Sequence, residues 1–326
     1  MISYFKEKLI INAKVIFFFV RFLKVSLISD EKKLHDPHKY CSPEYCVDIK
    51  SIQGCSSIGT SLPKVIWMYW DDLVLPKYLG NIVSNIKESN PSYEVRVLNR
   101  VTVFKYLPSD LFRGNVQLSH AHKSDVIRLF LLKEFGGIWI DISTILNEDL
   151  SWVEMCYKHF PYDLVGFFRK VSTENMNKPI IENWFMASPK NNKFITHWYD
   201  EFSKIIDLGA DGYYELLRSR SDFNIIKQNI SNPSYLLSYL SAQIVMNKND
   251  GEYSFFLKCC EESAFFYQRI NFWKPHLISF ELSRLDISDV DFKIIKLTKS
   301  DRMLLPIIGR MKLYSRESIF SIILKK

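Results

Sequence analysis

Glycine and proline are scarce in this sequence, with 11 glycines and 12 prolines among 326 residues. This composition excludes collagen-like and low-complexity chains, and we find no internal repeat. The motifs GxxxxGKS/T, GxGxxG, HExxH and GxSxG are also missing, which argues against P-loop enzymes, dinucleotide-binding enzymes, zinc proteases and α/β-hydrolases. With 47% apolar residues, the chain is long enough for one large α/β domain with additions, or for two small domains.

The cysteines form no recognisable framework. There are six, none of them in a CxxC pair, and two are adjacent. We therefore expect reduced thiols and a reducing, cytosolic setting. A structural zinc is the alternative, although the spacing of the nearby histidines and cysteines matches no usual ligand pattern. The cysteines are Cys41, Cys46, Cys55, Cys156, Cys259 and Cys260, and the zinc alternative uses His35, His38, Cys41 and Cys46.

The formal net charge is +7, which suits an anionic membrane surface or an anionic nucleotide substrate. No RNA- or DNA-binding signature is present, so we do not expect a nucleic-acid partner.

The N-terminal segment is apolar but carries regularly placed basic residues. Lys14, Arg21 and Lys24 interrupt the run from Leu9 to Ile28, and no small-residue cleavage site follows, so we do not expect a signal peptide. A membrane-spanning helix would place Lys14 and Arg21 in hydrocarbon at a cost of about 2.5 kcal/mol or more each. We expect residues 1–30 to form an amphipathic helix on an anionic membrane surface; packing on the domain's own core is the alternative.

The C-terminal residues 301–326 again interleave basic and apolar side chains. They predict either a second interfacial helix or an edge helix of the domain. Residues 31–60 are polar and are expected to form a connector, which leaves 61–300 for the main domain. Strands alternate with helices there, which predicts a mixed sheet between helical layers. Strands are expected at 65–70, 93–98, 138–140, 163–168, 184–187 and 293–297, and helices at 76–88, 101–106, 120–135, 192–206 and 235–247.

The segment from Ser119 to Leu146 is the most informative part of the chain. Its spacing predicts an N-capped helix, a stop at Gly136-Gly137, and a buried strand that ends at Asp141. Carboxylates at the carboxyl ends of buried strands commonly serve ligands in α/β proteins.

Asp125 and Arg128 share one face of this mostly apolar helix, which is therefore expected to be buried. They form either an intrahelical ion pair or a pair that faces a polar ligand beside Asp141.

The stretch KSDVIRLFLLKEFGGIWIDIS, with Ser124, Asp125, Arg128, Gly136-Gly137 and Asp141, resembles the signature of the capsular polysaccharide synthesis glycosyltransferases, which are related to glycosyltransferase family 32. LPKVIWMYWDD and NPSYEVRVLNR resemble two earlier strands of that family. Weaker similarities follow in ENWFMASPKNNKF, SYLLSYLSAQIVM and IIKLTKSD. The resemblance covers roughly residues 61–300 and implies the nucleotide-sugar fold called GT-A.

The resemblance also implies roles for individual residues. Asp141 would bind a divalent cation, Mn²⁺ or Mg²⁺, that neutralises the leaving diphosphate. Ser143 stands at the third position of the family's DxD motif and would add a hydroxyl ligand to that cation. Asp125 would contact ribose or sugar hydroxyls, and Arg128 the donor sugar or diphosphate. Trp70 would stack on the base, with core packing as the alternative.

Further residues carry weaker expectations. Trp67 and Trp139 are expected to pack in the core, and Asp71 and Asp72 to cap a strand end. Asn183 and Trp184 resemble a region that lines the acceptor side. Asp163 and His276 are additional polar candidates, the histidine as a further metal ligand, although each is more often structural.

We therefore expect a glycosyltransferase that moves a hexose-type sugar from a nucleotide-diphosphate sugar to a lipid-linked oligosaccharide in bacterial surface polysaccharide synthesis. A UDP-sugar is the expected donor, and the family implies retention of anomeric configuration. The expected location is the cytoplasmic face of the plasma membrane, peripherally bound. The alternatives are a sugar-phosphate transferase and a non-catalytic nucleotide-sugar-binding protein, which the serine at position 143 keeps open.

Overall fold

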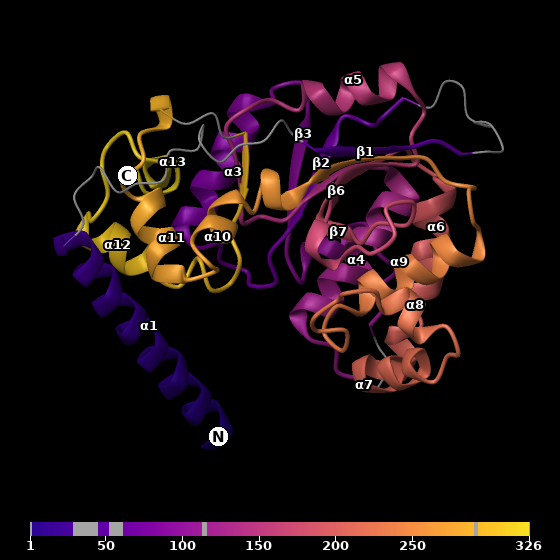
Figure 1. The fold of residues 1–326 in the computed structure, drawn as a ribbon, viewed down its shortest axis with the longest axis horizontal. Coiled ribbons are helices and arrows are strands. Elements are labelled where there is room, and N and C mark those ends of the chain that lie inside the picture. The colour runs from indigo at the N-terminus through magenta and orange to yellow at the C-terminus, as the bar shows by residue number, and fades with distance from the viewer. Residues whose placement is uncertain (1, 29–44, 52–60, 113–115, 290–292, 326) are drawn as a thin grey trace.

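The computed structural model describes residues 2–28, 45–51, 61–112, 116–289 and 293–325. A mixed seven-stranded sheet crosses the molecule in the order β1-β8-β6-β7-β4-β2-β3 (Figure 1). This confirms the predicted mixed sheet between helices. Its strands are β1 (Cys46–Ile49), β2 (Val65–Tyr69), β3 (Glu94–Leu98), β4 (Gly137–Ile140), β6 (Leu164–Phe168), β7 (Ile181–Ser188) and β8 (Phe255–Cys259).

The directions of the strands determine which strand ends lie at the same edge of the sheet. β2 is parallel to both β3 and β4, and β6 is parallel to β8. β4 and β6 are each antiparallel to β7, which lies between them, so they run in the same direction. We call the side of the sheet where β2, β3, β4, β6 and β8 end the carboxyl edge. Polar side chains that follow these strands, or that begin β7, gather there.

Helices cover both faces of the sheet. One face packs against helices that share a buried cluster with Trp67, Trp139 and Met186. The other packs against helices around Ile66, Ile140 and Phe185. On the first face lie α4 (His120–Phe135), α6 (Lys193–Phe202), α7 (Ile205–Arg218), α8 (Phe223–Lys227) and α9 (Leu237–Lys248); on the second lie α3 (Lys77–Ser89), α5 (Ser151–His159), α10 (Phe266–Ile270), α11 (Pro275–Leu282), α12 (Leu305–Met311) and α13 (Ile319–Leu324). Short 3-10 turns are η2 (Thr102–Lys105), η3 (Lys170–Ser172), η4 (Cys260–Glu262) and η5 (Ile287–Asp289).

The helix-stop-strand prediction around α4 is confirmed. The hydroxyl of Ser119 accepts a hydrogen bond from the backbone N–H of His122 and caps the helix. Gly136 and Gly137 follow with φ values of 64° and 95°, a region that favours glycine. A Cβ at Gly137 would lie 2.5 Å from Cγ1 of Val65, so close packing of β4 on β2 also requires glycine.

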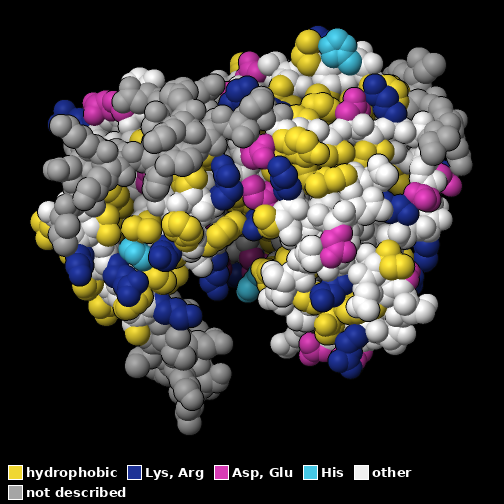
Figure 2. All heavy atoms as spheres, in the orientation of Figure 1, with side chains coloured by type: hydrophobic (Ala, Val, Ile, Leu, Met, Phe, Trp, Pro, Cys, Tyr) yellow, Lys and Arg dark blue, Asp and Glu magenta, His cyan; other side chains and the backbone are white. Residues whose placement is uncertain are grey.

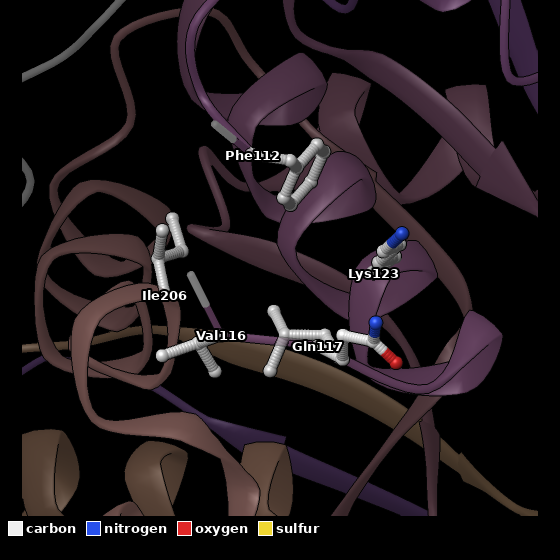
Figure 3. A pocket seen from close by; sticks show the side chains of 6 residues that line it. Phe112, Val116, Gln117, Lys123 and Ile206 are labelled. Carbon is white, nitrogen blue, oxygen red and sulfur yellow. The ribbon is translucent and has the colours of Figure 1, made fainter. Parts of the chain in front are cut away.

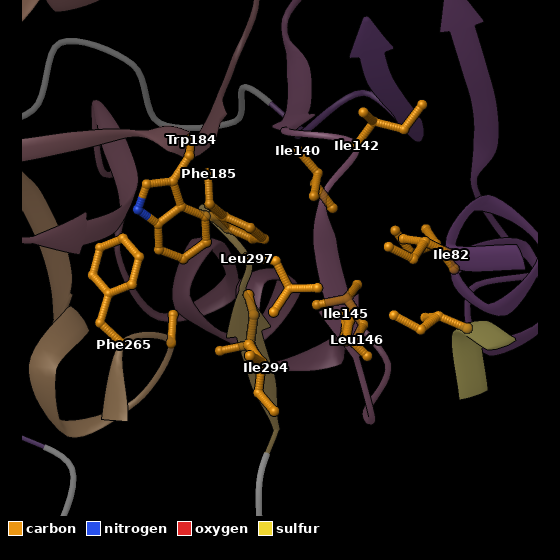
Figure 4. Packing of buried hydrophobic residues seen from close by; sticks show 14 of the residues in the cluster. Ile82, Ile140, Ile142, Ile145, Leu146, Trp184, Phe185, Phe265, Ile294 and Leu297 are labelled. Atoms are coloured by element: carbon orange, nitrogen blue, oxygen red, sulfur yellow. The ribbon is translucent and has the colours of Figure 1, made fainter. Parts of the chain in front are cut away.

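A second ladder lies against the main sheet. β5 (Thr144–Leu146) pairs antiparallel with β9 (Ile294–Lys296), and Thr144 stands opposite Lys296. Figure 4 shows its apolar side chains between Trp184 and Phe185 on one side and Ile82 of α3 on the other. The ladder therefore brings a late segment of the chain close to the end of β4.

The N-terminal helix α1 (Ile2–Ile28) extends away from the sheet beside α11 (Figure 1). Phe22 is fully buried, and the ring of Phe18 stacks on His276 at 5.9 Å between centroids. The alternative of packing on the domain's own core therefore holds for this face of the helix. No helix among the described residues has both the length and the apolar character needed to cross a membrane.

Two boundaries differ from expectation. β1 lies within the segment expected to be a connector, and it joins the sheet edge by pairing antiparallel with β8. Its four residues carry no strong alternation, which explains why the sequence did not reveal it. At the other end, Phe320 and Ile323 of α13 are fully buried against α3, and Leu305 and Ile308 of α12 are fully buried in the same cluster, so the C-terminal segment is an edge element of the domain.

Candidate active site

Asp141 follows β4 at the carboxyl edge, and its carboxylate accepts three hydrogen bonds from side chains. Its Oδ1 accepts hydrogen bonds from Nη2 of Arg128 at 3.1 Å and from Nε1 of Trp139 at 3.0 Å. Its Oδ2 accepts from Nζ of Lys296 at 2.6 Å. Burial alone would raise the pKa of Asp141, but Lys296 and Arg128 lower it to about 2. Asp141 is therefore ionised at neutral pH, with both oxygens fixed in direction.

Arg128 joins the helix to two strands. Its Nη1 donates to the carbonyl of Asn183 at 2.8 Å and lies 3.3 Å from Oδ1 of Asp125, while Nη2 donates to the hydroxyl of Ser124 at 3.1 Å. Only 6% of its side chain is exposed, and its guanidinium lies 5.0 Å from the ring centroid of Trp139. Arg128 pairs with Asp125 within the helix, as the first interpretation expects, and it also contacts Asp141. That the pair faces a polar ligand there stays a prediction.

Asp125 is held from the strand side as well. Nδ2 of Asn183, near the start of β7, donates to its Oδ1 at 3.0 Å. Burial raises the pKa of Asp125, and Arg128 opposes that rise. The structure thus brings together three residues predicted from the central motif, together with Asn183, which was expected to line the acceptor side.

Lys296 is the site residue that the sequence did not single out. Its ammonium donates to Asp141 and also to the hydroxyl of Ser143 at 2.9 Å, and its side chain is 11% exposed. The segment IIKLTKSD was noticed only as a weak family similarity, and a strand was expected there. The missed signal was that a lysine between buried isoleucine and leucine must project from the opposite side of that strand.

The predicted metal ligands Asp141 and Ser143 do come together, but a lysine ammonium lies between their oxygens. Divalent Mg²⁺ and Mn²⁺ are bound by oxygen ligands, and a neighbouring cation opposes them. Among the residues that the structure describes, no group of three or more histidine, cysteine, aspartate or glutamate side chains could hold a metal ion. This arrangement does not fit a divalent cation unless Lys296 moves away; the metal itself stays a prediction.

Trp70 and Asp71 follow β2 and therefore also lie at the carboxyl edge of the sheet. Trp70 is half-buried, the guanidinium of Arg302 lies 5.5 Å from its ring centroid, and its buried indole N–H has no hydrogen-bond partner among the described residues. Asp71 accepts from the hydroxyl of Tyr69 at 2.7 Å and lies 3.0 Å from Nδ1 of His120. Trp70 thus packs in part and reaches the carboxyl edge in part.

Other candidates have structural roles. Asp163 precedes β6, so it lies at the opposite edge of the sheet from Asp141, where it accepts from Asn192 and from the backbone of Ser254. His276 packs under α1, where its ring stacks on that of Phe18, and it belongs to no group of three or more potential ligands among the described residues; its role as a further metal ligand stays a prediction.

The expected core tryptophans and thiols are largely as predicted. Trp67 and Trp139 are fully buried; the second also donates to Asp141, a contact that packing alone did not predict. Trp184 is buried and stacks on Phe167 at 4.7 Å, so it supports the core rather than lining an open surface. Cys156, Cys259 and Cys260 are free thiols. Of the zinc alternative, Cys46 lies in β1, whereas His35, His38 and Cys41 lie outside the described residues, as does Cys55.

A cavity of about 160 Å³ lies on another side of α4 (Figure 3). Phe112, Val116, Lys123 and Ile206 are among its lining residues. Lys123 and Asp125 are two residues apart on the helix and so do not face the same way. The cavity is therefore separate from the Asp141 cluster.

Comparison with known proteins places the chain in a family. The family model described as "capsular polysaccharide synthesis protein" matches residues 26–206, more than half of the sequence. This chain belongs to that family. The matched part of this capsular polysaccharide synthesis protein includes α4, β4 and Asp141, whereas Lys296 lies beyond it.

The curated relatives of this family member include glycosyltransferases from fungi. The O-glycosyltransferase braB of Annulohypoxylon truncatum is 29% identical over 162 residues, which are 44% of this chain and 38% of that protein. The glycosyltransferase afumC of Aspergillus fumigatus is 25% identical over 177 residues, 49% of this chain and 44% of that protein. The chain thus spans about two fifths of the length of these relatives. A solved structure, PaToxG glycosyltransferase, aligns over 98% of this chain and 97% of its own with 13% identity and a TM-score of 0.36.

Proposed function

We propose that this capsular polysaccharide synthesis protein is a glycosyltransferase that uses a nucleoside-diphosphate sugar, a UDP-sugar in particular. The observation that carries the proposal is the buried cluster of Asp125, Arg128 and Asp141 at the carboxyl edge. Ligand sites of α/β proteins lie at that edge. The relatives named glycosyltransferases support the reaction class, and the parallel strands ending at this edge support the finer proposal of a GT-A fold.

The geometry suggests a role for each residue. Arg128 fixes both carboxylates, so their free lone pairs keep one direction before a donor arrives. Asp125, on the helix side, would accept hydrogen bonds from ribose or sugar hydroxyls. Asp141 would orient the charged groups that meet the diphosphate, with Ser143 beside it. Trp70, whose indole N–H finds no hydrogen-bond partner in the described part of the chain, would contact the base.

The reaction transfers one sugar to an acceptor hydroxyl. We propose that the acceptor is a lipid-linked oligosaccharide and that anomeric configuration is retained, as the family resemblance implies. Asn183 fixes Asp125 from the strand side, where the acceptor is expected to approach. Figure 2 shows the surface hollowed between the part that holds α7 to α9 and the part that holds α10 to α13, with charged side chains in the hollow. Such a recess suits two substrates that must meet away from bulk water.

The decisive experiment is release of nucleotide from a panel of nucleotide sugars, in buffer that contains both Mn²⁺ and Mg²⁺. We expect one donor to be hydrolysed or transferred, and Asp141→Asn to lower turnover by about 100-fold or more. The variant should melt at a lower temperature, because Arg128 and Lys296 lose their shared carboxylate, but circular dichroism should show that it is folded at the assay temperature. The matched control is Asp200→Asn, which removes an exposed carboxylate paired with Lys133. If sugar phosphate rather than sugar is transferred to the product, the alternative of a sugar-phosphate transferase is correct. If a nucleotide binds but no donor turns over, whichever acceptor is supplied, the chain is a binding protein.

We further propose peripheral attachment to an anionic membrane, at the cytoplasmic face of the plasma membrane, through α1. While Phe22 packs inward, Ile16, Phe17 and Val20 are more than half exposed on the other side of the helix. Figure 2 shows hydrophobic and basic side chains next to one another on the described part of this helix. An exposed apolar stripe flanked by basic residues is typical of helices that lie in a membrane interface. A lipid-linked acceptor would be held at the same surface.

Vesicle flotation tests this attachment. The triple variant Ile16→Ser, Phe17→Ser, Val20→Ser should stay in solution, while the parent floats with vesicles that contain phosphatidylglycerol and less well with phosphatidylcholine alone. The control carries Leu208→Ser and Ile225→Ser, which change exposed apolar residues on α7 and α8. Equal flotation of all three proteins would contradict the role of α1.

A further inference from the structure

The two oxygens expected to hold a divalent cation are already joined by a lysine. Nζ of Lys296 lies 2.6 Å from Oδ2 of Asp141 and 2.9 Å from Oγ of Ser143. An ammonium and a divalent cation at the same oxygens would repel each other at contact distance. The position that the family assigns to a metal is therefore filled, in this chain, by a side-chain cation.

The backbone of Lys296 is fixed from both sides. Its N–H donates to the carbonyl of Ala264 at 3.0 Å, and its carbonyl accepts from Nε2 of Gln268 at 2.7 Å. Its neighbours Ile295 and Leu297 are both fully buried in the core that Figure 4 shows. Since successive strand residues point to opposite sides, burial of these two directs Lys296 toward Asp141.

Side-chain cations compensate the carboxylate of Asp141 without a metal. Arg128 and Lys296 contact this carboxylate, and Arg128 also pairs with Asp125. Arg302 lies beside Trp70, just past the end of β2. Burial lowers the pKa of Lys296, Asp141 opposes that change, and the nearby charge of Arg302 adds to the lowering. Among these five groups the three cations outnumber the two carboxylates, an excess that suits a diphosphate.

We propose that Lys296 takes the place of the divalent cation and that its ammonium binds the donor diphosphate during sugar transfer. This inference rests on the glycosyltransferase function proposed above. An ammonium has three hydrogens, of which two point to Asp141 and Ser143, so the third is available to a phosphate oxygen.

The charge balance of the step follows from this placement. The bond from the anomeric carbon to the β-phosphate oxygen breaks, and its electron pair stays on that oxygen. The acceptor hydroxyl oxygen forms the new bond to the anomeric carbon, and its proton passes to the leaving phosphate. Lys296 stabilises the negative charge that develops on the phosphate and itself keeps all its protons.

The test is calorimetric titration of the full chain with UDP, GDP and ADP in turn, in EDTA and then in Mn²⁺. We expect one nucleotide to bind in EDTA with an affinity that Mn²⁺ changes by less than about threefold. Lys296→Met should weaken this binding about 10- to 100-fold, as expected for loss of one charged hydrogen bond. Lys296→Arg should recover part of the loss. Lys299→Met, which removes an exposed lysine three residues away, should match the parent.

The outcomes separate the two proposals. If nucleotide binding or donor turnover requires Mn²⁺ or Mg²⁺ in the parent, or if Lys296→Met binds nucleotide in EDTA as well as the parent does, the role of Lys296 is wrong while the glycosyltransferase stands. If no nucleotide binds and no donor turns over with or without metal, the glycosyltransferase proposal fails and this inference fails with it. Circular dichroism and thermal melting establish that each variant is folded; should Lys296→Met not fold, Lys296→Gln takes its place.

Discussion

Replacing Arg128 by alanine tests whether its ion pairs contribute to stability as buried pairs do or only as much as an exposed pair on a helix surface. The guanidinium contacts Asp125 and Asp141, and only 6% of it is exposed. Removing one partner of a buried pair typically costs about 3–5 kcal/mol, because the remaining charge is left without compensation. Here Lys296 still compensates Asp141, whereas Asp125 keeps only the amide of Asn183. Most of the loss should therefore come from Asp125.

The size of the expected thermal shift follows from chain length. An unfolding entropy of about 2.1 cal/mol/K per residue gives about 0.7 kcal/mol/K for a chain of this size. A loss of 3–5 kcal/mol should therefore lower the melting temperature by about 4–7 °C, measured by calorimetry. The matched control is Arg218→Ala, because Arg218 and Glu215 have the same three-residue helical spacing but are both about 60% exposed. That variant should lose no more than about 0.5 kcal/mol.

A second substitution identifies the cause. Asp125→Asn, added to Arg128→Ala, removes the uncompensated charge and should recover about 1–3 kcal/mol of the loss. The reasoning is refuted if Arg128→Ala and Arg218→Ala melt within 1 °C of each other, or if Asp125→Asn destabilises the Arg128→Ala protein further.

Two more predictions concern packing and pH. Gly137→Ala should destabilise the protein by more than about 1 kcal/mol, because the φ of Gly137 is 95° and the new Cβ would meet Val65. Gly80→Ala within α3 should instead stabilise it by up to about 1 kcal/mol, since no atom lies within 4 Å of the new Cβ. Denaturant unfolding of both variants measures this contrast, and equal effects would contradict it. Burial, followed by the charges of Arg21 and Lys274, lowers the pKa of His276 below its usual 6.5, so the folded state resists its protonation and stability should fall as pH drops from 6.5 toward the lowered value. His276→Phe, which keeps the ring against Phe18, should flatten the dependence of melting temperature on pH between 7 and 5; an unchanged slope would place its origin elsewhere.

The sequence predicted those parts of the fold in which one segment carries its own signal. The helix from His120 to Phe135 has a cap, a double-glycine stop and a buried strand after it, and all three features form as expected. Asp125 and Arg128 share a face because helix geometry fixes their spacing. Segments without such local signals were missed: β1 and β5 are only four and three residues long, and tertiary pairing rather than pattern makes them strands.

The candidate site was only half visible in the sequence for a related reason. Asp125, Arg128 and Asp141 lie within one short stretch, but Lys296 is 155 residues away from Asp141. Its strand pairs with β5 in a separate ladder, so even the order of strands in the main sheet would not have placed it. The family resemblance predicts a metal cation at Asp141, and it gives no reason to expect the ammonium of Lys296, which is also positively charged, at the same carboxylate.

The serine at position 143 and the lysine at position 296 are best understood together. A carboxylate at position 143 would accept a hydrogen bond from the ammonium of Lys296 as readily as the hydroxyl does. It would also change the summed charge of Arg128, Lys296, Arg302, Asp125 and Asp141 from positive to neutral. Serine keeps a hydrogen bond to Lys296 at 2.9 Å without adding a negative charge. If Lys296 binds a diphosphate as proposed, the site would retain an excess cation for it, which a carboxylate at position 143 would cancel. On this argument Ser143→Asp should weaken nucleotide binding in EDTA, and Mn²⁺ should restore it only when Lys296→Met is also present.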